Sequence, residues 1–62
     1  MRIFTTGFFQ LNSSDQAAVV NAVIRDLENS IGFLLNPKDE PRVTRRINRI
    51  RQRAIEHGVF SA

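Results

Sequence analysis

The sequence contains no cysteine, no tryptophan and no tyrosine among its 62 residues. Without cysteine the chain cannot form a disulfide, and thiolate zinc sites are excluded. Its three glycines, Gly7, Gly32 and Gly58, stand apart, so there is no glycine-rich loop of the kind that cradles phosphates. The single histidine, His57, has no partner residue at a metal-binding or catalytic spacing. We therefore expect a protein that is not an enzyme and that needs no metal and no cofactor.

Long apolar runs are also absent. No stretch approaches the roughly 18 residues of a membrane span, and Thr5, Thr6 and Gly7 interrupt the apolar N-terminus before a signal-peptide core forms. These features favour a cytoplasmic protein with no membrane partner. The length allows one domain, residues 1–62. A core of this size is marginally stable in a monomer, and without disulfides it favours self-association.

The apolar pattern predicts two helices. The first spans residues 13–35, with Ser13 and Gln16 as a capping box and Pro37 ending it. Its apolar residues recur every three or four positions and form one face; they are Ala17, Val20, Val23, Ile24, Leu27, Ile31, Leu34 and Leu35. A connector over residues 36–41 leads to a second helix over 41–57, and Gly58 is expected to end it in a left-handed conformation.

The first eleven residues do not share this helical pattern. Residues 2–9 are rich in the β-branched and aromatic types that strands favour. No other segment predicts a strand, so this one either pairs with its copy in a second subunit or lies as an extended arm over the helices. The expected fold is therefore all-α or mainly α: an antiparallel two-helix hairpin with an N-terminal arm or strand. Because the chain is small, we expect this hairpin to form a dimer.

Charge is distributed unevenly along the chain. The net charge is +3 overall, but residues 1–36 carry −1 and residues 37–62 carry +4. On a helical wheel five arginines of the second helix share an arc of about 100° beside the apolar stripe, whereas Arg51 lies apart from them. The five are Arg42, Arg45, Arg46, Arg49 and Arg53. Neighbours three and four residues apart repel each other by a few tenths of a kcal/mol per pair, which bound anions would relieve.

Two interpretations of this arginine arc are open. It is either a solvated surface with weak ion pairs or a surface that binds phosphates or carboxylates. We favour a small nucleic-acid-binding regulatory protein whose arginines contact phosphates, with Asn48 and Gln52 beside the arc as candidate base readers. The alternative is a small interaction module, an inhibitor or adaptor, that binds an acidic surface of a partner protein.

The remaining apolar residues bear on assembly. Val19, Ala22 and Phe33 lie off the main apolar face of the first helix, and a second apolar strip of this kind predicts a homodimer interface. Five phenylalanines are expected to serve the core rather than to stack on bases. His57 is expected in the last helical turn, where positive charge suits the helix dipole.

Overall fold

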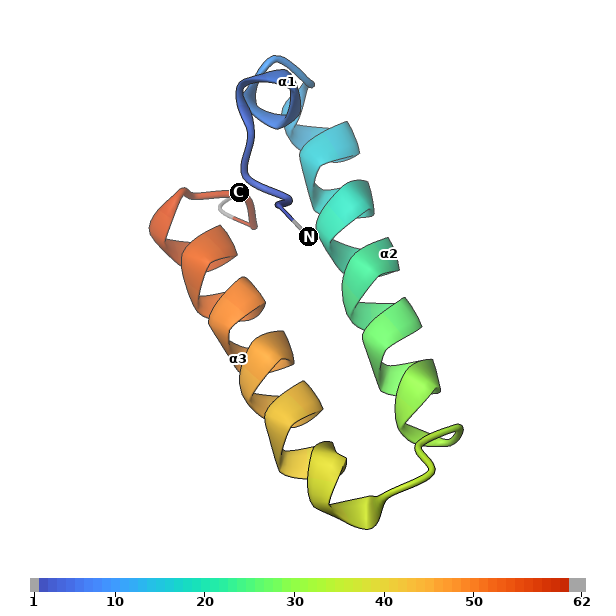
Figure 1. Cartoon of the computed structure of the whole chain (residues 1–62). Coiled ribbons are helices and arrows are strands. Elements are labelled where there is room, and N and C mark those ends of the chain that lie inside the picture. The colour runs from blue at the N-terminus through green and yellow to red at the C-terminus, as the bar shows by residue number, and fades with distance from the viewer. Residues whose placement is uncertain (1, 61–62) are drawn as a thin grey trace.

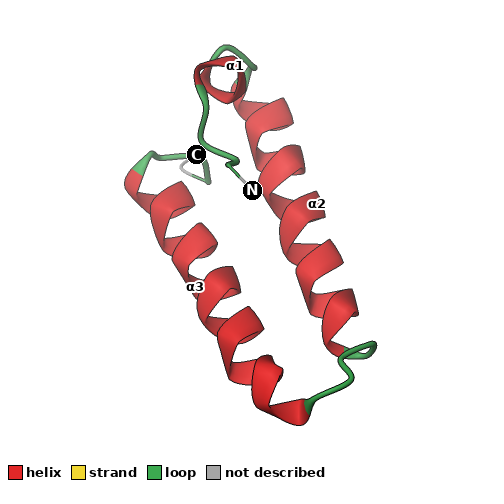
Figure 2. Cartoon of the chain, in the orientation of Figure 1, coloured by secondary structure: helices red, strands yellow, loops and turns green. Residues whose placement is uncertain are grey.

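The protein folds as a helical hairpin. The computed structural model describes residues 2–60, and every regular element within them is helical. A short helix, α1 (Thr6–Phe9), precedes two long helices, α2 (Ser13–Ile31) and α3 (Glu40–Glu56), and the 3₁₀ turn η1 (Pro37–Asp39) leads into α3. Figure 2 shows α2 and α3 running antiparallel along the length of the molecule. The mainly α fold and the two-helix hairpin are therefore confirmed, whereas the dimer stays a prediction.

The N-terminal segment differs from the expected strand. Residues 2–5 are irregular, and residues 6–9 form the single turn of α1. The Thr5 hydroxyl caps this turn by accepting a hydrogen bond from the Phe8 N–H at 3.2 Å. A lone strand would leave its backbone groups without partners. The turn satisfies them locally and directs the Phe8 ring into the core, where it is 5% exposed.

Helix α2 begins as expected but ends four residues early. Its N-cap is Asn12 rather than Ser13, because the Asn12 Oδ1 accepts the Asp15 N–H at 2.8 Å. After Ile31 the chain makes only tight, 3₁₀-type turns, and the side chain of Leu35 is fully exposed. Extending the helix through Gly32 costs about 1 kcal/mol. A Leu35 that nothing covers contributes no burial to offset that cost, so the prediction of a helix to residue 35 was wrong.

Helix α3 matches its predicted limits to within one residue at each end. Pro41 lies in its first turn, where the missing N–H is not needed. Gly58 adopts the left-handed conformation with φ of 73°. The N–H groups of Gly58 and Val59 then donate to the carbonyls of Ile55 and Ala54, which is the Schellman arrangement. This cap turns Val59 back into the core, where it is 4% exposed.

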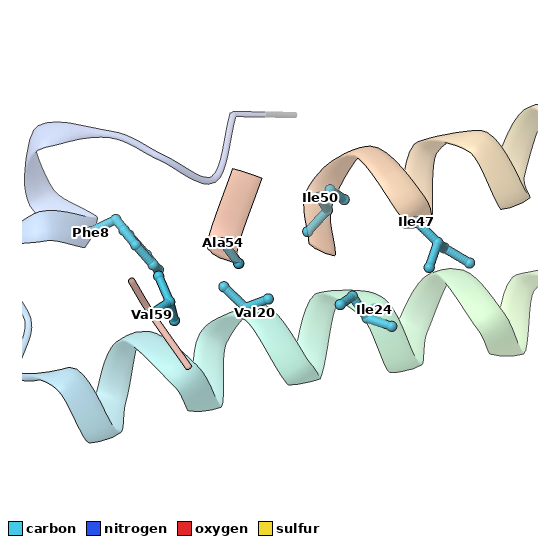
Figure 3. Packing of buried hydrophobic residues seen from close by; sticks show 7 residues of the cluster. All are labelled: Phe8, Val20, Ile24, Ile47, Ile50, Ala54 and Val59. Atoms are coloured by element: carbon cyan, nitrogen blue, oxygen red, sulfur yellow. The ribbon is translucent and has the colours of Figure 1, made fainter. Parts of the chain in front are cut away.

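The core lies between the two long helices and is closed at one end by α1. Seven residues are buried: Phe8, Val20, Ile24, Ile47, Ile50, Ala54 and Val59. In Figure 3 the α3 residues face Val20 and Ile24 of α2, while Phe8 and Val59 meet at the end of the hairpin. The predicted apolar faces of both helices therefore supply most of this core, whereas Leu34 and Leu35, which lie past the end of α2, are not buried.

The N-terminal arm, residues 2–5, lies beside the long helices instead of extending away from them. Figure 1 shows its trace running between the ends of α2 and α3 that lie nearest α1. Ile3 and Phe4 are partly buried and pack against the core. Residues 2–5 thus lie over the helices as one of the two alternatives expected, whereas residues 6–9 form α1 instead of continuing an extended arm.

Candidate nucleic-acid interface

The core-facing residues of α3 determine where its arginines lie. Ile47, Ile50 and Ala54 are buried against the rest of the hairpin. Residues three and four positions apart share a helix face, so the rotation of α3 is determined by these three side chains. The five arginines that share the flank are all exposed. Because the apolar stripe anchors the helix, the charged flank is held in one orientation.

All five arginines of the arc line a single groove. The groove has a volume of about 840 Å³ and is partly open to solvent. The arm contributes to its lining and adds a sixth arginine, Arg2. Apolar side chains supply the rest of the lining, namely Ile3, Phe4, Leu27, Val43 and Ile50. We call this site the arginine groove; its six arginines are Arg2, Arg42, Arg45, Arg46, Arg49 and Arg53.

Within residues 2–60 no carboxylate lines the arginine groove, and none of its six arginines forms an ion pair there. The ion pair found in this part of the chain joins Arg51 Nη2 to Glu28 Oε1 at 3.0 Å, outside the groove. Arg51 therefore has an internal partner, whereas the groove arginines have none among residues 2–60.

The two candidate base readers do not join the groove. Asn48 and Gln52 are exposed on α3, but neither belongs to the lining. The Gln52 amide instead lies 3.5 Å from Glu56 Oε1, one helical turn away. Both lie on α3, as the sequence predicts, but outside the lining of the groove. The geometry therefore does not place these two residues with the six arginines.

Sequence reasoning missed the contribution of the arm. Phe4 stacks near Phe9 with a ring-centroid distance of 6.3 Å and meets the edge of Phe8 at 5.3 Å. The His57 ring lies 5.4 Å from that of Phe4 and 4.9 Å from that of Phe9. His57 is also the C-cap residue of α3. The four rings fasten the arm to the end of α3, and the aromatic-rich segment 4–9 was the one available signal.

The predicted interface residues on α2 occupy different surroundings. Val19 is partly buried and packs against the core of its own chain. Ala22 is exposed on α2, and Phe33, just past its end, is 83% exposed. Val19 therefore already has an apolar partner within the chain, while the other two remain available to a second subunit.

Other kinds of site find no basis in the described part of the chain. Residues 2–60 contain no cluster of three or more side chains able to hold a metal ion. Nor does any helix there combine the length and the apolar character that a membrane crossing requires. Comparison of the chain with family models, curated proteins and solved structures finds no match. The arginine groove is accordingly the feature on which a functional proposal rests.

Proposed function

We propose that the protein is a small regulatory protein that binds nucleic acid through phosphate contacts in the arginine groove. The observation that carries the proposal is the set of six arginines, none of them ion-paired within residues 2–60, lining a groove without a carboxylate. Guanidinium groups donate two parallel hydrogen bonds to phosphate oxygens, which makes arginine well suited to this ligand. The protein acts in this proposal by binding and not by catalysis, and its site of action is the cytoplasm.

The length of the groove fits a run of phosphates. Arg42 and Arg53 are eleven residues apart on α3, which corresponds to about 16 Å along the helix axis. One strand of a duplex carries a phosphate about every 3.4 Å along its axis, so this length matches about five of them. Five or six arginines facing about five phosphates give a balanced interface.

Pairing into a homodimer completes the proposal. Ala22 and Phe33 expose apolar surface on one chain, and a core of seven buried residues gains stability from association. Two copies of the arginine groove would double the number of phosphate contacts. Avidity of this kind strengthens binding without any new type of contact.

A direct titration tests the proposal. A labelled oligonucleotide is titrated with the protein at low salt, and binding is followed by fluorescence anisotropy. We expect saturable binding that weakens steeply as salt is added, because displaced counterions return to the nucleic acid. The Arg51→Ala variant serves as the matched control, since Arg51 is an arginine of the same helix outside the groove. Its affinity should stay close to that of the unchanged protein.

The alternative partner is an acidic protein surface. The connector between the long helices favours this alternative, because it holds two highly exposed apolar side chains, Phe33 and Leu35. Exposed apolar side chains close together are typical of protein contacts. In this case no oligonucleotide would bind. An acidic protein would instead be retained from nuclease-treated lysate by the unchanged protein and by Arg51→Ala, but not by Arg49→Ala.

A further inference from the structure

We infer that the arginine groove accepts a single strand of nucleic acid in preference to a duplex, with the Phe4 ring as a platform on which a base stacks. This inference rests on the proposed function and names the form of nucleic acid that the groove fits. Three features carry it: the concave shape of the site, the presence of an aromatic ring in its lining, and the way in which that ring is held.

The shape of the site opposes insertion of α3 into duplex DNA. The major groove is about 12 Å wide and admits one helix, whose own diameter with side chains is about 10–12 Å. Here the arm lies beside the end of α3 nearest α1, and Arg2, Ile3 and Phe4 share the lining of the site with the arginines of α3. With the arm beside it, α3 is not an isolated helix that can enter a groove of its own width. A duplex would therefore meet the arm before α3 could insert fully, whereas a single strand can follow the exposed lining.

An apolar lining under charged side chains matches the chemistry of a single strand. Proteins that bind single strands combine a basic groove along the backbone with aromatic rings under the bases. In this groove Arg2 and Phe4 of the arm share the lining with five arginines of α3. A base in a duplex keeps its faces covered by its neighbours, so it cannot use such a ring. Phosphates alone would not need one.

The Phe4 ring is held firmly by its neighbours. It meets Phe8 edge-on with an interplanar angle of 82°, and Phe9 and His57 pack around it at 6.3 and 5.4 Å. Phe4 is nevertheless only partly buried, and it lines the groove. A ring fixed in this way loses little conformational freedom when a base stacks on it. Phe8 and Phe9 are not expected to stack on a base, since neither of them lines the groove.

The test compares three ligands with the unchanged protein. They are an oligothymidylate of about ten nucleotides, an abasic oligomer with the same number of phosphates, and a duplex of the same length. We expect the oligothymidylate to bind about tenfold more tightly than the abasic oligomer, because stacking adds to the phosphate contacts. It should also bind more tightly than the duplex. Equal binding of oligothymidylate and abasic oligomer would overturn the role of the ring.

Two outcomes separate the inference from the function beneath it. If the duplex binds as tightly as the single strand or more so, the preference is wrong while nucleic-acid binding stands. If none of the three ligands binds at low salt, the proposed function itself fails. Tight binding of a single nucleoside triphosphate in competition with the oligomer would also overturn the inference, since it would assign the groove to a small ligand.

A pair of variants locates the stacking ring. Phe4→Leu keeps an apolar side chain in the core but removes the ring, and it should lower affinity for oligothymidylate several-fold while leaving the abasic oligomer unaffected. Phe60→Leu removes a ring that is 44% exposed and lies outside both the groove and the aromatic cluster around Phe4. This variant should change neither the affinity for oligothymidylate nor the affinity for the abasic oligomer. Equal losses in both variants, or a loss of abasic binding in Phe4→Leu, would contradict the assignment.

Crosslinking provides a readout that does not depend on a folded variant. An oligomer with bromouracil in place of thymine is irradiated with the unchanged protein, and the crosslinked residue is identified by mass spectrometry. A crosslink at Phe4 is expected. Crosslinks confined to Phe33 or Phe60, which lie outside the groove, would overturn the inference.

Discussion

Replacing Ile47 by alanine tests the packing on which the site depends. Ile47 is 5% exposed in the contact between α3 and α2. The change removes three carbon atoms, which at about 0.8 kcal/mol each amounts to about 2.4 kcal/mol of lost transfer free energy. The cavity left behind raises the expected loss to about 2–5 kcal/mol. A domain of this length has a total unfolding free energy of about 3–9 kcal/mol, so the loss is a large part of the whole.

Thermal unfolding followed by far-ultraviolet circular dichroism measures this loss. A change of 1 kcal/mol shifts the Tm of a domain this small by about 4–8 °C, so Ile47→Ala should lower it by at least about 10 °C. Leu35→Ala is the matched control, because the Leu35 side chain is fully exposed beyond the end of α2. It should change stability by less than about 0.5 kcal/mol. Equal destabilisation by both variants would refute the end of α2 at Ile31.

Two further predictions concern the helix cap and the dimer. Gly58→Ala should destabilise the protein by about 1–2 kcal/mol because φ is positive at Gly58. Gly32→Ala should stabilise it by about 0.4–1 kcal/mol, because φ at Gly32 is −67°. If urea unfolding showed the same direction of change for both variants, the two cap assignments would be contradicted. Light scattering should give a molar mass of about twice 7.1 kDa for the unchanged protein and about half that mass for Phe33→Glu. If the unchanged protein were a folded monomer at micromolar concentration, the homodimer would be ruled out.

Helix positions and their buried faces followed from the sequence because they depend on local periodicity. Ile47, Ile50 and Ala54 recur at helical spacing, and their burial determines the flank on which the arginines lie. The left-handed Gly58 was predictable for a similar reason, since a glycine after an apolar helical pattern is a local signal. No long-range contact has to be known for either inference.

The parts that sequence reasoning missed depend on contacts between distant segments. The arm folds back because Phe4 and Phe9 pack against His57, which is about fifty residues further along the chain. Nothing in the spacing of the arm residues indicates that contact. The end of α2 was misjudged because periodicity shows which residues share a face but not whether another element covers them. Leu35 continues the apolar spacing of α2 in the sequence, yet it lies past the end of that helix and is fully exposed.

The dependence of affinity on salt tests the arginine groove most directly. The slope of log affinity against log salt is about −0.9 per phosphate contact on a duplex and about −0.7 on a single strand, so six arginines predict about −5 or −4 per chain. Arg49→Ala, in the middle of the groove, should make the slope shallower by one contact. Arg51→Ala should leave the slope unchanged, because the Arg51 side chain pairs with Glu28 and lies outside the groove. Equal reductions of the slope in both variants would show that total charge, and not the arginine groove, determines binding.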